Sequence, residues 1–426
     1  MNTLEKLRSG KLAGATRLDL SLGLSELPPE VFSLADTLEV LNLSGNRLSA
    51  LPAEMPRLKR LKVLFCSNNP FSALPEVLGA CPALEMIGFK ACELTHVPSQ
   101  ALPPGLRWLI LTDNRIARLP DTFERYTRLQ KLMLAANDLR ELPPSLAECR
   151  RLELLRISSN QLGALPPWLL QLPRLAWLAY AGNPLCTSTD VCPTSAASIE
   201  WQALTLEHKL GEGASGQVYQ ARLAEGESVA VKCFKGTQTS DGSPEDEIAA
   251  ALQVGRHPNL VPMRGRLEGH PESLPGLVMG LIEPSYQVLA GPPSLQSCTR
   301  DQYAPATRFS ASTARTLLAG IASAAAHFHR YGVMHGDLYA HNILRRDDGH
   351  ALIGDFGAAS LYRADGGHTA RALEAIEVRA FGILLEEVWA RCEMPPPHWR
   401  ALSEACQQPD LEARPRFTAL EAALAS

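Results

Sequence analysis

The stretch "LEVLNLSGNRLSALP", residues 38–52, decides the fold of the first part of the chain because it recurs with few changes. Close copies are "LKVLFCSNNPFSALP" at 61–75 and "LRWLILTDNRIARLP" at 106–120. The position that follows each leucine-rich run is held in turn by Asn46, Asn69, Cys92, Asn114, Asn137, Asn160 and Asn183. These positions lie 22 or 23 residues apart, and a fixed period in this range is typical of stacked repeats.

The repeated phrase resembles the leucine-rich repeat, whose pattern is L-x-x-L-x-L-x-x-N/C-x-L. The resemblance implies one short strand per repeat, with leucines facing a shared core and alternate side chains facing the concave surface. The Asn side chain is expected to hydrogen-bond turn backbone that would otherwise be buried unpaired. We therefore predict an α/β leucine-rich repeat solenoid over residues 1–186.

The side chains expected on the concave surface are more apolar than those of a solvated sheet face. An apolar stripe on a concave repeat surface favours a protein partner or substrate. The alternative is that the stripe packs against the second domain. Its predicted members are Val40, Val63, Phe65, Met86, Trp108, Ile110, Met133, Leu154 and Trp177.

The repeats end near Leu185, and the segment "CTSTDVCPTSAASIE" at 186–200 is rich in small polar residues and proline, as linkers are. We predict a linker over residues 187–203. Cys186 and Cys192 in this segment admit a small disulfide. Scattered single cysteines without a secretion signal favour buried reduced thiols instead.

Length and composition indicate an ordinary two-domain globular protein. The chain has 426 residues, 46% of them hydrophobic, and a formal net charge of −4, which argues against a nucleic-acid partner. The N-terminus lacks the apolar core of a signal peptide, and no run of about 18 apolar residues predicts a membrane span. A cytoplasmic location is therefore expected.

A glycine-rich loop opens the second domain, in "LGEGASGQVYQARLAEGESVAVKCF" at 210–234. Gly211, Gly213 and Gly216 lie between two expected strands, whereas a dinucleotide-binding motif needs a helix after the loop. Glycines let backbone amides approach phosphates without a Cβ clash. With the motifs that follow, residues 204–426 resemble the protein kinase superfamily. This resemblance implies an α+β two-lobed domain that uses ATP and Mg²⁺.

The resemblance assigns an ATP site residue by residue. Lys232 of "VAVK" would hold the α- and β-phosphates, and Glu247 would fix that lysine in position, with Glu245 as its rival. The segment "GLVMGLIEP" at 276–284 would meet the adenine. The predicted site consists of Gly211, Gly213, Gly216, Val218, Ala230, Lys232, Glu247, Met279, Gly280, Ile282 and Asp355.

The stretch "HGDLYAHNIL" at 335–344 resembles the catalytic loop of the family. Asp337 would accept or orient the proton of the attacking hydroxyl, so the predicted catalytic residues are Asp337, Lys232 and Asn342. Asn342 and Asp355, the latter in "GDFGAAS", would hold Mg²⁺, which prefers hard oxygen ligands. His335 is expected to support the loop rather than act as a base.

The chain departs from the family at several positions. Gly336 replaces the arginine that in related kinases pairs with a phosphorylated activation loop, so activation by that route is not expected. Tyr339 replaces the lysine typical of Ser/Thr kinases. No Ala-Pro-Glu occurs between Asp355 and Glu377, which predicts a trimmed C-lobe.

Two consequences of the shortened segment stay open at this point. Arg414 loses the glutamate with which it pairs in the family, so its partner is undefined. Ser360, Tyr362 and Thr369 are the hydroxyl side chains of the segment. They are either autophosphorylation sites or, as we expect, exposed loop residues.

Taken together, the motifs favour an ATP-dependent protein kinase that phosphorylates protein hydroxyls, with Ser/Thr favoured and Tyr open, and whose repeats recruit a protein partner or substrate. One alternative is a small-molecule kinase of the aminoglycoside or choline type, because those relatives also carry His-Gly-Asp. A pseudokinase scaffold that only binds ATP is the other. It is disfavoured because Lys232, Asp337, Asn342 and Asp355 are all present.

Overall fold

The computed structural model describes the chain except for residues 1–2, 187–196, 214, 237, 239–240 and 426. Its contacts divide it into two compact units, 1–155 with 160–172 and 156–159 with 173–426. Residues 156–159 and 173–186 thus group with the second unit, although the sequence assigns them to the repeats. Most of the predicted linker, including Cys192 and its candidate disulfide, lies outside the described residues.

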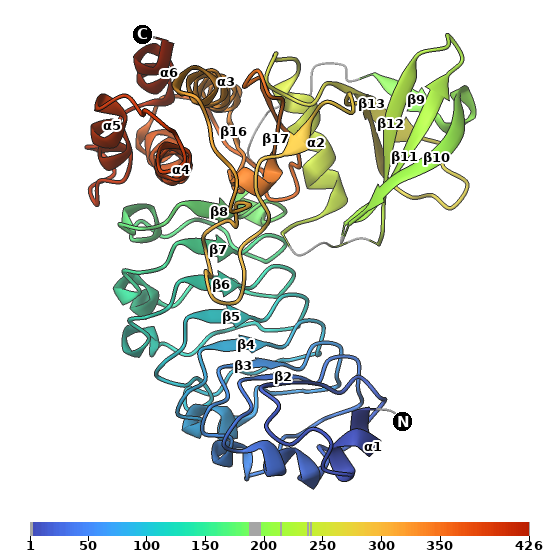
Figure 1. Ribbon diagram of the computed structural model, residues 1–426, viewed down its shortest axis with the longest axis vertical. Helices are drawn as coiled ribbons and strands as arrows, with labels where there is room; N and C mark the ends of the chain where they lie inside the picture. The colour runs from blue at the N-terminus through green and yellow to red at the C-terminus, as the bar shows by residue number, and fades with distance from the viewer. Residues whose placement is uncertain (1–2, 187–196, 214, 237, 239–240, 426) are drawn as a thin grey trace. The chain divides into compact units, whose positions relative to one another are not determined.

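The first unit is built from repeated three-residue strands that follow helix α1 (Thr3–Arg8). The strands pair in parallel and in chain order, and equivalent residues one repeat apart are in register, as in Val40 with Val63 (Figure 1). This arrangement confirms the predicted repeat solenoid. The strands are β1 (Arg17–Asp19), β2 (Val40–Asn42), β3 (Val63–Phe65), β4 (Met86–Gly88), β5 (Trp108–Ile110), β6 (Lys131–Met133) and β7 (Leu154–Arg156).

The return segments of the repeats are short 3-10 helices rather than α-helices. The Leu-Pro dipeptide leaves few residues for each return, and the prolines at the start of two of these helices have no N–H to donate. The 3-10 helices of the first unit are η1 (Pro29–Leu34), η2 (Met55–Arg57), η3 (Glu76–Ala80), η4 (Phe123–Arg125), η5 (Pro144–Glu148) and η6 (Leu169–Gln171).

The buried asparagines satisfy the turn backbone, as predicted. Asn137 Nδ2 donates to Leu111 O at 2.9 Å and to Leu134 O at 3.0 Å, and its Oδ1 accepts from Ile116 N at 3.0 Å. Cys92 performs part of this task, because its Sγ donates to Cys66 O at 3.1 Å. Each such side chain joins neighbouring repeats through groups that are hidden from water.

The second unit begins with two pieces of repeat and continues into a β-rich lobe. Ile157 N donates to Ala179 O at 2.8 Å, which ties residues 156–159 to strand β8 (Trp177–Ala179). The six-stranded sheet of the lobe has the order β10-β11-β12-β14-β13-β9, and helix α2 (Pro244–Val254) belongs to the same lobe (Figure 1). Its strands are β9 (Ser198–Glu200), β10 (Leu204–Glu212), β11 (Gly216–Leu223), β12 (Ser228–Phe234), β13 (Met263–Glu268) and β14 (Gly276–Gly280).

Residues 198–203, which the sequence analysis placed in the linker, have regular structure in this lobe. They form β9, which pairs in parallel with β13, and the 3-10 helix η8 (Trp201–Ala203). Ile199 and Trp201 pack against the buried core of the sheet.

A helical lobe completes the second unit, as the kinase resemblance predicts. Its helices are α3 (Ala311–Arg330), α4 (His368–Trp389), α5 (His398–Cys406) and α6 (Phe417–Ala425) (Figure 1). Short strands frame the catalytic loop: β15 (Gln287–Val288), β16 (Val333–Met334), β17 (Ile343–Arg345), β18 (Ala351–Ile353) and β19 (Ser360–Leu361). Helix α4, which carries Glu377, starts at His368, soon after β19 ends at Leu361. Only a short connection therefore lies between them, as the missing Ala-Pro-Glu motif predicts. Among the described residues, none of the helices combines the length and hydropathy that a bilayer span requires.

The predicted concave stripe is wrong at Trp177, which is 1% exposed and covered by the catalytic loop of its own unit. Val63, Met86 and Leu154 are also buried. The stripe members that keep partial exposure are Val40, Phe65, Trp108, Ile110 and Met133.

We expect Asn137→Ala to lower the free energy of unfolding of the repeats by about 1–3 kcal/mol, because buried backbone groups lose their partners. Urea denaturation measures this loss. Asp138→Ala, at the exposed neighbouring position, is the matched control. Equal stability of the two variants would contradict the role of the asparagine ladder.

Candidate active site

A cavity of about 420 Å³ lies between the two lobes of the second unit and gathers most of the predicted nucleotide residues. Leu210, Val261 and Leu344 add apolar surface that the sequence analysis did not assign. The predicted residues in its lining are Val218, Ala230, Met279, Gly280, Ile282, Asn342 and Asp355.

The glycine-rich loop connects β10 to β11 at this cleft. Gly211 lies in β10, Gly216 starts β11, and Gly213 N donates to Gly216 O at 2.9 Å. A Cβ on Gly216 would lie 2.5 Å from Cys233 O, so this position has no room for a side chain. None of the three glycines lines the cavity itself.

Lys232 pairs with Glu247, not with its rival Glu245. Lys232 Nζ lies 2.5 Å from Glu247 Oε1, and the Glu247 side chain is 3% exposed. Glu245 instead binds Arg266 at the surface, at 2.7 and 2.9 Å. Ser243 caps the helix by accepting from Asp246 N, so α2 starts where its second glutamate faces the sheet.

Burial raises the pKa of Glu247 to about 7, with a further contribution from the negative charge of Asp355, although Lys232 opposes both. The ionised pair that holds Lys232 in position therefore forms fully only above neutral pH.

The backbone of the catalytic loop is bound to a buried carboxylate from α4. Glu377 accepts from His335 N at 3.1 Å and from Gly336 N at 2.7 Å, and His329 Nε2 lies 2.9 Å away. Burial alone would raise the pKa of Glu377, but the contacts with His329 and the Gly336 N–H lower it below its ordinary value. Glu377 therefore stays ionised and fixes the start of the loop.

His335 has the structural position that the sequence analysis expected. Its ring is fully buried between Phe328 and Phe356, with centroids 5.6 and 5.4 Å away. Nε2 lies 3.1 Å from Gly354 O, and Nδ1 lies 3.3 Å from Asp337 N. The ring thus joins the catalytic loop to the segment that carries Asp355.

Asp337 and Asn342 are in direct contact. Asn342 Nδ2 donates to Asp337 Oδ2 at 2.8 Å and to Asp337 O at 2.9 Å. The amide oxygen of Asn342 is then the end left to bind a cation. Asp355 is exposed, has a left-handed backbone with φ of +58°, and accepts from Gly357 N at 3.2 Å. The Asn342 amide oxygen and the Asp355 carboxylate are hard oxygen donors, so these two side chains fit Mg²⁺.

Sequence reasoning missed Arg156, which contacts Asp337, the predicted catalytic aspartate, directly. Its Nη2 pairs with Asp337 Oδ1, Nη1 donates to Gly336 O at 2.9 Å, and Nε lies 2.6 Å from Asp241 Oδ1. A signal was present in the repeats. Arg156 holds the position that Ile110 and Met133 hold in their strands, so it is a cation that follows the uncharged residues Phe65 to Met133 of the same column.

Tyr339 turns toward β8 rather than into the nucleotide cleft. Its ring stacks on Trp177 with centroids 4.0 Å apart and an interplanar angle of 8°, and Trp177 Nε1 donates to Leu338 O at 3.1 Å. Burial raises the pKa of the Tyr339 hydroxyl well above its usual value. Tyr339 is thus a neutral packing residue where Ser/Thr kinases place a lysine.

Gly336 is required by the close approach of two other backbone segments. Its φ is +73°, and a Cβ would lie 2.6 Å from Leu178 O and 2.5 Å from Ala358 O. A family-type arginine at this position does not fit.

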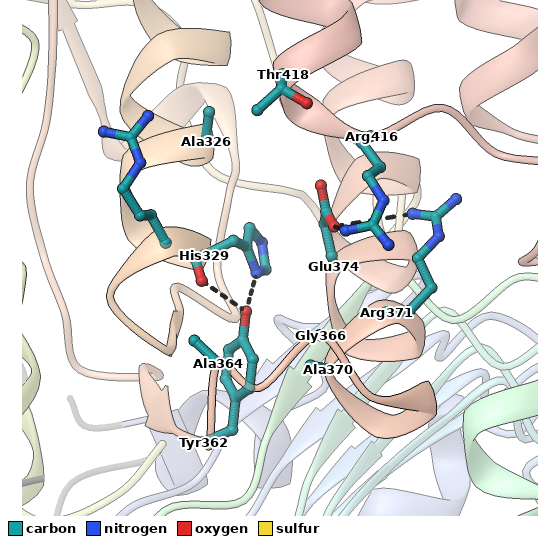
Figure 2. Close-up of a pocket in the computed structure, with 11 residues that line it drawn as sticks. Ala326, His329, Tyr362, Ala364, Gly366, Ala370, Arg371, Glu374, Arg416 and Thr418 are labelled. Atoms are coloured by element: carbon teal, nitrogen blue, oxygen red, sulfur yellow. Dashed lines mark hydrogen bonds and ion pairs between the residues drawn. The ribbon is translucent and has the colours of Figure 1, made fainter.

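The predicted phosphorylation sites divide by exposure, and the expectation of exposed loop residues is wrong for two of them. Ser360 is fully buried, and its Oγ accepts from Tyr180 N at 3.0 Å. Tyr362 is buried, with its hydroxyl 2.6 Å from His329 Nδ1 (Figure 2). Thr369 is exposed at the start of α4.

A second cavity, of about 290 Å³, is lined by Tyr362, Glu374, Arg371 and Arg416 among others. Figure 2 shows Glu374 beside Arg371 and Arg416, whereas the Tyr362 hydroxyl points to His329. Glu374 Oε1 accepts from Phe417 N at 2.9 Å.

Arg414, whose partner the sequence left undefined, binds backbone carbonyls instead of a glutamate. It donates to Ala375 O at 2.8 Å, Gln408 O at 2.8 Å and Pro173 O at 2.9 Å.

Comparison with protein families supports this reading of both units. Residues 204–374 match the protein kinase domain, and residues 36–79 and 104–162 match leucine-rich repeat models. The chain thus joins N-terminal leucine-rich repeats to a protein kinase domain, the arrangement of a leucine-rich repeat kinase.

Individual relatives are kinases that match over part of their length. CBL-interacting protein kinase 22 of Oryza sativa subsp. japonica is 35% identical over 165 residues, which cover 37% of this chain and 36% of the relative. Serine/threonine-protein kinase PkaA of Streptomyces coelicolor is 34% identical over 181 residues, or 38% and 30% of the two chains. Cyclin-dependent kinase 11.1 of Caenorhabditis elegans is 30% identical over 159 residues, or 36% and 21%. The chain therefore spans about a third or less of these relatives.

We expect kcat/KM for ATP to rise with pH and to reach half its limiting value near pH 7, because Glu247 must ionise to hold Lys232. In Glu247→Gln, kcat/KM for ATP should no longer rise with pH and should stay near the value that the wild type has at low pH. Glu245→Gln should keep the wild-type profile, since Glu245 pairs with Arg266. A wild-type profile that is flat between about pH 6 and 8 would contradict the assignment.

Gly336→Ala should destabilise the second unit more than Gly366→Ala does. Both positions have nearly the same positive φ, but a Cβ at Gly366 meets nothing within 4 Å. Gly366→Ala should therefore cost about 1 kcal/mol for the backbone conformation alone. Gly336→Ala adds two clashes with backbone, which we expect to cost at least about 1 kcal/mol more. Equal losses in urea denaturation would show that β8 does not confine this position.

Proposed function

We propose that the protein is an ATP-dependent kinase that transfers the γ-phosphate to protein hydroxyls, with Ser and Thr as the favoured acceptors. The observation that supports this most is the set of paired groups around one cleft. Lys232 pairs with Glu247, Asn342 pairs with Asp337, and Asp355 lines the same cavity as Asn342. Phosphoryl transfer depends mainly on such positioning.

The β-rich lobe would bind the nucleotide. Val218 and Ala230 supply apolar surface for the adenine, and the backbone of Gly280 to Ile282 supplies polar groups at its edge. Lys232, held by Glu247, would bind the α- and β-phosphates, while the glycine-rich loop brings backbone amides to the phosphates.

The catalytic loop would act on the acceptor. Asp337 orients the attacking hydroxyl and accepts its proton, while Asn342 keeps the Asp337 carboxylate in position through Nδ2. Asn342 and Asp355 would hold Mg²⁺ through their side-chain oxygens. When bound, the ion neutralises charge on the phosphates.

Partner recruitment would fall to the partly exposed part of the concave stripe: Val40, Phe65, Trp108, Ile110 and Met133. Apolar side chains that keep some exposure on a repeat surface favour a protein partner. Trp177 has no part in this role because it is buried. A cytoplasmic location remains our expectation from the sequence.

The His-Gly-Asp motif does not favour a small-molecule kinase over a protein kinase in this chain. Gly336 has a packing reason in this chain, because Leu178 O and Ala358 O exclude a side chain there. The motif therefore does not need a shared substrate class to explain it.

The test uses the purified full chain with radiolabelled ATP, Mg²⁺ and a generic protein mixture, beside a panel of aminoglycosides and choline. We expect label on Ser and Thr, and a loss on the order of 10²- to 10⁴-fold in Asp337→Asn. Label on small molecules alone would assign the chain to the rival class. Tight ATP binding without any transfer would make it a scaffold.

A further inference from the structure

The residue that the proposed mechanism leaves unexplained is Arg156. It lies 181 residues before Asp337 in the chain, is 2% exposed, and has all three guanidinium nitrogens engaged. Two of those nitrogens bind the catalytic loop. A buried arginine with this many directed contacts fixes its partners in one geometry, because its planar fork has few alternatives.

We propose that Arg156 is a positioning residue for phosphoryl transfer: it supplies from the repeats the cation that the catalytic loop itself lacks. The inference rests on the proposed kinase function. The loop offers no cation of its own at the two family positions, since residue 336 is glycine and residue 339 is a neutral, buried tyrosine. Arg156 is the positive group that pairs with Asp337 among the described residues.

Arg156 and Glu377 bind different groups of the catalytic loop. Glu377 accepts from the N–H groups of His335 and Gly336, whereas Arg156 donates to the Gly336 carbonyl and to the Asp337 carboxylate. The peptide units on both sides of Gly336 are thereby fixed, and so is the side chain that follows. Asp241, at 2.6 Å, orients the guanidinium.

The arrangement holds the carboxylate without covering it. Arg156 and Asn342 contact the two carboxylate oxygens of Asp337, yet the Asp337 side chain keeps 22% exposure, so part of it stays accessible to an acceptor. A blocking residue would instead have to cover the accessible side, where an acceptor hydroxyl must arrive. The geometry therefore favours support of the base over inhibition.

The glycine at position 336 has a matching explanation. A Cβ there would lie 2.6 Å from Leu178 O, so the absence of a side chain lets β8 approach the loop. Trp177, in the same strand, stacks on Tyr339 and donates to Leu338 O. Arg156 and β8 thus replace two loop side chains of the family with groups from the repeats.

The experiment compares Arg156→Ala, Arg156→Lys and the control Arg151→Ala in the full chain. Arg151 lies in the same repeat and is exposed. For each variant, kcat and KM are measured for ATP and for the protein mixture, and ATP affinity is measured by titration calorimetry. We expect Arg156→Ala to lower kcat on the order of 10- to 100-fold, as loss of orientation does, with ATP affinity within about twofold of wild type.

Arg156→Lys should recover part of kcat, since an ammonium keeps the charge but can meet fewer of the three acceptors. A role limited to folding would lower ATP affinity and the active fraction together and leave the kcat of the folded enzyme unchanged. Asp241→Asn provides a second test if Arg156→Ala does not fold, and it should reduce kcat less than Arg156→Lys does.

Two outcomes would overturn the inference while the kinase function stands. Unchanged kcat in Arg156→Ala would make the contact irrelevant to transfer, and raised kcat would make Arg156 an inhibitory clamp. A wild-type protein without transfer would instead overturn the proposed function itself. Arg151→Ala should match wild type in every measurement.

Discussion

Two buried charged side chains bind the start of the catalytic loop, and the proposed active site depends on this constraint. The Glu377 carboxylate binds the N–H groups of His335 and Gly336, and the Arg156 guanidinium binds the Gly336 carbonyl and the Asp337 carboxylate. Charges buried in this way are costly unless their hydrogen bonds are complete. The loop supplies two hydrogen-bond partners to each of these charges, so a movement of the loop would leave both charges partly unsatisfied.

This constraint explains the two residues at which the loop departs from the kinase pattern. Comparison with the family residues alone shows only the loss of an arginine and a lysine from the loop, at Gly336 and Tyr339. In the structure, Gly336 makes room for Leu178 O, and Tyr339 stacks on Trp177. The last repeat strand and the catalytic loop are thus parts of one packed unit. The last repeat strand thus supplies packing and a hydrogen bond to the catalytic loop.

The sequence predicted well what local pattern determines. The 22- to 23-residue period specified the repeats, and the order of glycine loop, Lys232, Asp337 and Asp355 specified the kinase fold, because both depend on fixed short spacings. It could not predict contacts between distant segments. Trp177 was read as exposed from strand parity, and Arg156 passed unnoticed, since burial by the catalytic loop depends on residues more than 150 positions away. The burial of Ser360 against Tyr180 and of Tyr362 against His329 likewise comes from segments that the local pattern does not bring together.

The most direct test of the central claim is a double-mutant cycle in the free energy of unfolding, with Arg156→Ala, Asp337→Asn and the double variant. It needs no substrate and reports the pair alone. We expect a coupling energy of at least about 1 kcal/mol, because Asp337→Asn removes one of the two carboxylates that the buried Arg156 binds, and Arg156→Ala removes the cation from the partly buried Asp337. Single-variant losses that add within about 0.3–0.5 kcal/mol would show that Arg156 and Asp337 do not depend on each other.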